Sequence, residues 1–339
     1  MQLTLEEVYE LSLAALRGSG ASQGQAAPVA DSIREAEAEG IRNVGLGYLP
    51  IYCEHLRCGK VKGDAEARLI EAAPAVLRVD AGHGFCHPAF LLALPRFCDM
   101  AEGSGVAALA IARSYSAGVV GWFVERLAER GLVALAFANS SAAIAPWGGS
   151  KPLFGTNPIG FAAPCPGGPP IVVDMASSAT ARVNIVQAAA RGEAVPPGWV
   201  FDSEGRPTTD PTALLAGGSV GPLGGAKGYG LALMVDILAA GLTGASWSHE
   251  ASSFGGNEGG PPDVGQLFIA LAPRATGGEN LGERLAGLAD LIADQPGARL
   301  PGDKRHDHRR AAICDGVDVP EELVRQLEGY AKSPMSGAV

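Results

Sequence analysis

Backbone punctuation constrains the fold of this chain more than any other feature. Its 339 residues include 47 glycines and 24 prolines, which divide the apolar stretches into short runs. These residues end helices and interrupt strands, so the chain must form many short elements joined by tight turns. Apolar residues make up 47% of the chain and charged residues only 18%, which excludes a disordered protein. The length predicts two domains, or one large domain with an insertion.

Charge and hydropathy exclude two classes of partner. A net charge of −10 leaves no concentrated basic surface of the kind that nucleic acid requires. No apolar run reaches the roughly 18 residues of a membrane span, so we expect no membrane partner. The first residues lack a basic segment before an apolar one, so we expect no signal peptide. These features predict a soluble cytoplasmic protein.

The cysteines and histidines do not form a metal-binding pattern. The six cysteines contain no C-x-x-C pair and are expected to be free, mostly buried thiols. His83 and His87 are four residues apart, but Gly82, Gly84 and Pro88 disfavour a helix at this point. The sequence therefore predicts no metal site.

Hydrophobic periodicity predicts helices and strands in alternation, which is typical of an α/β protein. The pairs Thr4/Glu7 and Ser22/Gln25 have the spacing of helix caps; the second helix should end near Glu39. Further helices are expected at 47–56, 91–102, 121–130, 231–240, 279–293 and 319–330. Short apolar runs predict strands at 75–80, 106–112, 132–138, 170–175 and 266–271. Turns should fill 146–164, 255–263 and 299–305, and residues 333–339 should form a disordered tail.

Three glycine clusters are candidates for a nucleotide-binding loop. The cluster at 18–24 follows a predicted helix, whereas a dinucleotide fingerprint must follow a strand. The cluster at 82–84 follows a strand but lacks a third glycine and a ribose-binding acid. The cluster at 224–230 precedes an apolar helix, and its free amides with Lys227 suit an anionic ligand. The residues alone leave open the alternative of a strand-to-helix turn with a surface lysine.

Five motifs in order carry a resemblance to a known family: Phe154-Gly155-Thr156-Asn157-Pro158, Val173-Asp174-Met175-Ala176-Ser177-Ser178, Pro197-Gly198-Trp199, Thr208-Thr209-Asp210-Pro211 and Leu223-Gly224-Gly225-Ala226-Lys227-Gly228. With these motifs the chain resembles the malate/L-lactate dehydrogenase family over about residues 4–330. That family includes L-sulfolactate, ureidoglycolate and diketogulonate enzymes and the Δ1-piperideine-2-carboxylate/Δ1-pyrroline-2-carboxylate reductases. Residues 265–267 and 299–305 resemble the cyclic-imine reductase branch in particular.

The resemblance implies an NAD(P)-binding fold that is not a Rossmann domain. The expected architecture is the layered α/β fold of sulfolactate dehydrogenase, with a largely antiparallel sheet. A helical domain would combine residues 1–74 with 280–332, and residues 75–279 would bind cofactor and substrate. The family also implies a homodimer.

The resemblance further implies NADPH as cofactor, with NADH as the alternative. Asp174 would accept hydrogen bonds from ribose hydroxyls. Lys304 and Arg305 would pair with the 2′-phosphate, unless they are only surface residues near a turn. The residues expected at the cofactor are Ser116, Ala117, Gly118, Thr156, Asp174, Met175, Ala176, Arg182, Ala226, Lys227, Gly302, Asp303, Lys304 and Arg305.

The chain departs from the family at its polar catalytic positions. The family's Ser-His-Gly, which precedes Leu-Pro-x-Tyr, here reads Asn43-Val44-Gly45, so the proton-donating histidine is replaced by valine. Tyr48 stands where the family usually has a basic residue. The family's His-Phe-Gly segment here reads Ser-Ala-Gly at 116–118, and its supporting aspartate aligns with Asn184.

These departures favour an imine substrate over a ketone. Reduction of a ketone needs a proton donor, because an unprotonated alkoxide is unfavourable at neutral pH. A cyclic imine can bind already protonated and accept hydride without an enzymic acid. We therefore predict reduction of a cyclic imino acid of the Δ1-piperideine- or Δ1-pyrroline-2-carboxylate type.

Other readings stay open. One alternative is a 2-hydroxy acid dehydrogenase of malate, lactate or sulfolactate type. Another is a catalytically silent homologue that binds a nucleotide or metabolite. A replacement acid would be Tyr48, Tyr115 or His55, each of which could equally be a packed structural side chain. Arg42 or Arg182 would hold a substrate carboxylate. With Tyr52 on the substrate side, the candidate catalytic positions are Tyr48, Tyr115, His55, Asn43 and Asn184.

Overall fold

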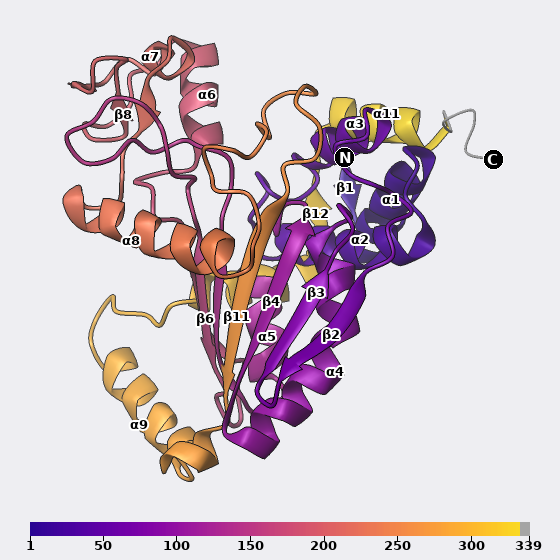
Figure 1. The fold of residues 1–339 in the computed structure, drawn as a ribbon, viewed down its shortest axis with the longest axis vertical. Coiled ribbons are helices and arrows are strands. Elements are labelled where there is room, and N and C mark those ends of the chain that lie inside the picture. The colour runs from indigo at the N-terminus through magenta and orange to yellow at the C-terminus, as the bar shows by residue number, and fades with distance from the viewer. Residues whose placement is uncertain (333–339) are drawn as a thin grey trace.

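The computed structural model describes residues 1–332; the predicted tail at 333–339 lies outside them (Figure 1). The α-helices are α1 (Leu5–Gly18), α2 (Gln23–Ala38), α3 (Leu49–Arg57), α4 (Cys86–Ser104), α5 (Gly121–Ala128), α6 (Arg182–Arg191), α7 (Thr212–Leu215), α8 (Ala226–Asp236), α9 (Leu281–Ala293), α10 (Asp303–Asp315) and α11 (Glu321–Lys332). A π-helix (Ile237–Gly241) continues α8, and a 3-10 helix covers Pro273–Thr276.

A seven-stranded sheet forms the centre of the molecule, in the order β2-β3-β4-β11-β5-β6-β7. Its strands are β2 (Arg68–Ala73), β3 (Val76–Asp80), β4 (Val106–Ser114), β5 (Val133–Ala138), β6 (Ile159–Ala163), β7 (Ile171–Met175) and β11 (Val264–Leu271). The β3–β4 pair is parallel and the other neighbours are antiparallel, which confirms the expected largely antiparallel sheet. Strand β11 comes late in the chain but lies between β4 and β5, so the sheet is completed only by a distant segment.

Helices cover both faces of the sheet. Alternate residues of β11 point to opposite faces and pack against different helices. Phe268 packs against Phe90 of α4 and Phe123 of α5, with ring centroids 5.0 and 5.3 Å apart. Leu267 and its partner Phe137 face the other way, under α8 and the π-helix. The helices therefore hold the sheet from two sides.

A helical unit contains both ends of the described chain. Strand β1 (Gln2–Leu3) pairs with β12 (Val317–Asp318), and α1 packs against α11 around Val8, Leu16 and Leu327. The capping box of Thr4 and Glu7 is formed as the sequence predicts. The domain boundaries at 74 and 280 remain a prediction. Strand β2 lies before residue 74 but belongs to the central sheet, and α9, which follows residue 280, has no buried residue.

A small lobe with its own apolar core lies at the same end of the molecule as α3 (Figure 1). It contains α6, α7 and the strands β8 (Val200–Phe201), β9 (Pro207–Thr208) and β10 (Ser219–Val220). Its core includes Ile185, Val200, Leu214 and Val220. This lobe presents one side of the site described below.

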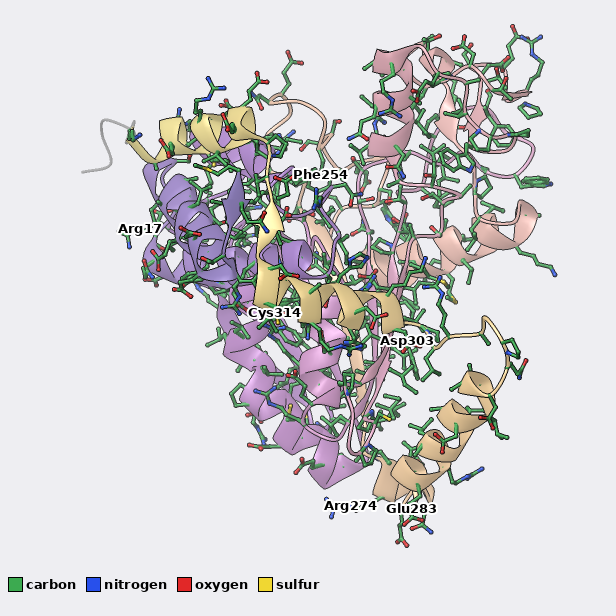
Figure 2. All side chains as sticks on the ribbon, turned by 180° about the vertical axis from the view of Figure 1, so that it is seen from behind. Arg17, Phe254, Arg274, Glu283, Asp303 and Cys314 are labelled. Carbon is green, nitrogen blue, oxygen red and sulfur yellow. The ribbon has the colours of Figure 1, made fainter. Side chains whose placement is uncertain are left out.

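The prediction of a basic loop at 299–305 is wrong for its last three residues, because α10 begins at Asp303. Residues 303–315 carry polar side chains on every face, so no apolar stripe identifies the helix. Ion pairs hold it instead: Arg309 binds Glu39 and Glu125. Lys304 and Arg305 consequently lie in the first turn of a helix (Figure 2 labels its first residue, Asp303).

Three further expectations need correction. Helix α4 begins at Cys86 rather than at residue 91, so His87 is helical although Pro88 follows it. A proline in the first turn is tolerated because the first N–H groups of a helix have no intrahelical partner. Strand β6 crosses the region expected to be turns, and α8 begins five residues before the expected helix, at its glycine cluster.

Neither a metal centre nor a membrane span is found among residues 1–332. No group of three or more potential ligand side chains gathers there, and no helix has the length and hydropathy to cross a bilayer.

Candidate active site

The turn at 42–48 holds Asn43 and Val44, which the sequence analysis aligns with the family's catalytic pair. Leu46 donates its N–H to Oε1 of Glu37 at 2.7 Å, and a Cβ added to Gly45 would lie 2.4 Å from the same oxygen. Glycine at 45 therefore lets the turn close on α2. Val44 is half-buried against the apolar core under the sheet, and Arg42 is exposed. Burial raises the pKa of Glu37, although the hydrogen bond from Leu46 opposes this effect.

Five aromatic rings, called here the aromatic cluster, follow this turn: Tyr48, Tyr52, Phe85, Tyr115 and Phe254. The ring centroids of Tyr48 and Tyr52 are 5.0 Å apart, and those of Tyr115 and Phe254 are 5.2 Å apart. Phe85 and Tyr52 also contact Tyr115 edge to face. Such pairs add stabilisation beyond the area they bury. The cluster joins α3 to the end of β4 and to the loop before β11.

His55 and Tyr115 are hydrogen-bonded to each other inside this region. The His55 side chain also reaches the carbonyl oxygen of Gly256, 3.1 Å from Nε2. A carbonyl only accepts, so Nε2 carries the proton, Nδ1 accepts, and the Tyr115 hydroxyl donates. Both residues are at most 1% exposed, and burial with the nearby Lys60 charge lowers the pKa of His55. Two of the three candidate proton donors, His55 and Tyr115, are therefore hydrogen-bonded to each other.

Burial raises the pKa of the Tyr52 hydroxyl, and the nearby Ser116 side chain in the segment at 116–118 lowers it. Ser116 also accepts the N–H of Gly118 at 3.2 Å, and a Cβ on Gly118 would lie 3.2 Å from the Tyr52 hydroxyl. Tyr48 is the more accessible tyrosine, being half-buried. Burial raises its pKa to about 12, so its hydroxyl is protonated at neutral pH.

An ionic cluster lies at the other end of segment 116–121. Gly121 donates its N–H to Oδ2 of Asp174 at 2.9 Å, and the Arg305 guanidinium lies 3.6 Å from the same oxygen. Arg305 is also 3.7 Å from Glu39, which pairs with Arg309. Burial raises the pKa of Asp174. We call Glu39, Glu125, Asp174, Arg305 and Arg309 the ionic cluster.

The other expected cofactor segments adjoin β7 through a chain of hydrogen bonds. The Thr156 carbonyl accepts both the N–H and the hydroxyl of Ser177, each at 2.8 Å. Leu223 donates its N–H to the carbonyl of Ser177 at 2.9 Å. Segments 116–121, 156, 174–177, 223–227 and 302–305, scattered in the sequence, are thus contiguous in space.

Lys227 lies in the first turn of α8 and is exposed, as is Ala226. The first amides of a helix lack intrahelical partners, so they and the lysine form a donor set for an anion. A hollow of about 250 Å³ lies beside this turn, with Trp147, Phe201 and Pro222 in its wall. A Cβ on Gly225 would lie 3.2 Å from the Trp147 ring. The structure therefore has room and donors for a phosphate-bearing ligand here.

Arg182 and Asn184 belong to α6 in the small lobe, where the sequence analysis expected no helix. Both are exposed. Asn184 donates from Nδ2 to the Thr180 hydroxyl at 3.0 Å, a contact local to its own helix start. Neither residue has a direct contact with the aromatic cluster in the described part of the chain, so their roles stay predictions.

The sequence analysis missed most of a buried polar network around Asn157. Asn157, fully buried, donates to the Ala232 carbonyl at 2.9 Å and lies 3.4 Å from Asp236. The Ser248 hydroxyl donates to Asp236 at 2.6 Å. This network ties the Gly-Thr-Asn-Pro motif to α8. The motif pointed to Asn157, whereas nothing in the spacing marks Asp236 or Ser248.

The most unusual of the missed groups is Lys60, which is only 1% exposed. Its ammonium donates to the carbonyl oxygens of Ser253, Gly256 and Glu258 at 2.5, 2.9 and 2.7 Å. A lysine in a Gly/Lys turn reads as a surface residue, so only the structure reveals it.

Comparisons with known proteins show which family the chain resembles along its length. The family model described as malate/L-lactate dehydrogenase matches residues 3–328. The chain is 45% identical over 331 residues to a (2R)-3-sulfolactate dehydrogenase (NADP(+)) of Chromohalobacter salexigens, covering 98% of both. It is 41% identical over 329 residues to a Δ1-pyrroline-2-carboxylate/Δ1-piperideine-2-carboxylate reductase of Pseudomonas aeruginosa, covering 96% of this chain and 98% of the relative.

Solved structures give the same result. A Δ1-piperideine-2-carboxylate reductase from Pseudomonas syringae superposes with a TM-score of 0.92 at 36% identity, covering 97% of this chain and 99% of that one. Sulfolactate dehydrogenase from Methanocaldococcus jannaschii has a TM-score of 0.88 at 28% identity, covering 97% and 96%. These matches confirm the fold and the resemblance read from the motifs. The chain belongs to the malate/L-lactate dehydrogenase family and is an NAD(P)-dependent oxidoreductase.

Proposed function

We propose that this protein reduces a cyclic imino acid of the Δ1-pyrroline- or Δ1-piperideine-2-carboxylate type at C2, with NADPH as cofactor. One observation carries the proposal: Val44 in the turn at 42–48 is an apolar residue packed on the core, and the sequence analysis aligns it with the family's proton-donating histidine. The buried imidazole of His55 donates to Gly256 and accepts from Tyr115. Relatives named as reductases of such imines, at 38–41% identity, support the same substrate class.

The residues present suit a substrate that arrives with its own proton. A protonated cyclic imine needs only hydride to become an amine, so no side chain has to deliver a proton during the reaction. The aromatic cluster offers an apolar wall for a small ring and excludes water. Arg42, exposed at the edge of the turn, would hold the carboxylate with its two-pronged guanidinium.

The contiguous segments fit a nicotinamide dinucleotide, which would supply the hydride when bound. Asp174 takes both of its recorded contacts on Oδ2, so Oδ1 can accept a ribose hydroxyl. Lys227 and the α8 amides would bind the pyrophosphate. Lys304 is exposed in the first turn of α10 and would pair with a 2′-phosphate, with Arg305 beside it. Thr156, Met175, Ala176, Gly302 and Asp303 would line the same groove.

A second candidate is reduction of a 2-oxo acid to a 2-hydroxy acid, as by a sulfolactate dehydrogenase. It is favoured by the 45% identity to the (2R)-3-sulfolactate dehydrogenase. This reaction needs a proton donor, and Tyr48 would serve, because it is the accessible hydroxyl at the site.

A cofactor and substrate panel tests the proposal. NADPH and NADH binding is measured first by fluorescence titration. NADPH oxidation is then followed with Δ1-piperideine-2-carboxylate, Δ1-pyrroline-2-carboxylate, 3-sulfopyruvate, pyruvate and oxaloacetate. Turnover of the imines alone supports the proposal, and turnover of an oxo acid alone selects the second candidate. Binding without turnover would identify a catalytically silent homologue.

We also propose a cytoplasmic homodimer. Exposed apolar side chains on α8 and the π-helix include Met234, Ile237 and Leu242, of which Leu242 is 66% exposed. Apolar surface concentrated in this way commonly marks an interface. All six cysteines are free, as suits a reducing compartment. Light scattering of the purified protein, and of a Leu242→Glu variant, tests the assembly.

A further inference from the structure

The loop before β11 closes over the buried end of the aromatic cluster. Phe254 packs on the Tyr115 ring with centroids 5.2 Å apart (Figure 2 labels Phe254). Its far end is also held, because Ser246 donates its N–H to the Asp263 carbonyl oxygen at 2.9 Å. The segment between is rich in glycine and has no apolar residue of its own besides Phe254 and two prolines. Packing alone is therefore too little to hold such a segment in one conformation.

Lys60 holds this loop in place by hydrogen bonds. Its three ammonium protons are directed at three carbonyl oxygens of this loop, those of Ser253, Gly256 and Glu258. Lys60 makes no ion pair with any acidic side chain in the described residues, so these carbonyls are its recorded electrostatic partners. Hydrogen bonds from a charged donor are stronger than neutral ones. The ammonium thus fixes the curvature of segment 253–258.

The same contacts determine how His55 is protonated. The Gly256 carbonyl accepts from both Lys60, at 2.9 Å, and His55 Nε2, at 3.1 Å. Once Gly256 is fixed, His55 must keep its proton on Nε2 and present Nδ1 to the Tyr115 hydroxyl. Tyr115 directly precedes the segment at 116–118 that contacts Tyr52. A path of direct contacts therefore runs from Lys60 to the expected cofactor segment.

We propose that Lys60 is a positioning residue. It holds segment 253–258 closed on the aromatic cluster and, through Gly256, fixes the Nε2–H tautomer of His55 and the orientation of Tyr115. The expected effect of Lys60 on catalysis rests on the proposed imine reductase activity. Its effects on the loop and on the His55 tautomer do not depend on that activity, so the structural role and the proposed reaction can be refuted separately.

The test replaces the ammonium while keeping the length of the side chain. In Lys60→Met, chymotryptic cleavage after Phe254 should become about tenfold faster or more, because the loop loses three charge-assisted hydrogen bonds. Lys62→Met is the matched control: Lys62 is exposed, lies two residues away, and should leave the cleavage rate unchanged. Lys60→Arg keeps the charge with a planar head group and should give intermediate protection.

Histidine-selective ¹⁵N NMR provides the second measurement. The wild-type protein should show His55 as a neutral imidazole protonated on Nε2, and Lys60→Met should shift or broaden this signal. With an imine substrate, Lys60→Met should lower kcat/KM about tenfold through kcat, and Lys60→Arg should recover part of the loss. If Lys60→Met does not fold, the cleavage and NMR comparison between wild type and Lys60→Arg decides.

Equal cleavage rates in Lys60→Met and wild type would overturn the proposal, as would an Nδ1–H or cationic His55 in the wild type. If no imine is turned over but the loop and tautomer respond as expected, the positioning role stands and only the proposed reaction fails.

Discussion

The aromatic cluster and the ionic cluster are joined by segment 116–121, and they hold their side chains by opposite means. The aromatic cluster uses neutral rings and the neutral hydrogen-bonded pair of His55 and Tyr115. Burial lowers the pKa of His55 and so opposes its ionisation. The ionic cluster uses compensated charges, with Glu39 between Arg305 and Arg309. The difference indicates a division of labour. A neutral wall suits a substrate that brings its own proton, and a charged anchor suits a cofactor that carries phosphate.

The largest expected effect is on the ionic cluster. Arg309→Met should lower the free energy of unfolding by about 3 kcal/mol, because buried Glu125 loses its ion pair and buried Glu39 keeps only the longer contact to Arg305. Urea denaturation followed by circular dichroism measures the change. The neighbouring Arg310→Met is the control, since its pair with Asp307 is 70% and 67% exposed and should contribute nothing measurable. Equal stability of the two variants would show that the ionic cluster is not structural.

The next effect concerns the aromatic side of the comparison. Asn43→Ser combined with Val44→His restores the family's proton donor and should raise 2-oxo acid reduction about 100-fold, or about 2.7 kcal/mol of barrier. Steady-state rates with NADPH and pyruvate or sulfopyruvate measure it. Asn43→Ser alone is the control, because it restores no acid. An unchanged oxo acid rate in the double variant would mean that the missing acid does not explain the substrate preference.

Within the aromatic cluster, Tyr115→Phe removes the hydroxyl that donates to His55. We expect a loss of about 1–3 kcal/mol in the free energy of unfolding, because His55 Nδ1 is left buried without a partner. Chemical denaturation is again the measurement. Tyr9→Phe, at a half-buried ring of α1, should change stability much less. A Tyr115→Phe variant as stable as the wild type would show that the buried pair is energetically neutral.

The cofactor anchor should respond to Lys304→Ala with an increase of about five- to tenfold in KM for NADPH and little change for NADH. Initial rates with each cofactor separate the two. Arg310→Ala, on the same helix but in a surface pair, provides the comparison. An equal rise for both cofactors would indicate that Lys304 does not contact the 2′-phosphate.

The smallest effect concerns Glu37, which accepts the N–H of Leu46 in the turn before the aromatic cluster. Burial raises its pKa in the folded state above that in the unfolded chain, so its charge destabilises the protein as pH rises through the folded pKa. Glu37→Gln keeps an acceptor for Leu46 and should be about 1 kcal/mol more stable than wild type at pH 7. The gain should vanish near pH 4, below the pKa of the unfolded chain. Denaturation at both pH values checks this sign, and a gain that grows on acidification would contradict it.

Several parts of the fold were predictable because local signals agreed with the tertiary structure. The Thr4 and Glu7 capping box and the apolar strands mark their elements directly, whereas the glycine cluster at 224–230 concealed the start of α8 at Ala226. Helix α10 was not predictable, since its stability comes from ion pairs between distant segments and not from an apolar stripe. Strand β6 was missed because five residues between Pro158 and Pro164 look like one more turn.

The candidate site divides in the same way. Motifs predicted the cofactor segments around Thr156, Asp174 and Lys227, and the alignment of Asn43 and Val44 with the family's catalytic pair. Spacing in the sequence could not show that His55 and Tyr115 are hydrogen-bonded to each other, because these residues are 60 positions apart and meet only in the folded chain. The burial of Lys60 could not be predicted for the same reason, as its hydrogen-bond partners are about 200 residues away in the sequence.

The sequence by itself determined the family, the short punctuated elements and the absence of an acid at position 44. Glycine, proline and side-chain chemistry act locally, so they can be read along the chain. The tertiary structure decided which polar groups are paired and which remain available. Pairing depends on burial and on contacts between distant segments, and these exist only once β11 and the loop before it have closed on β4 and α3.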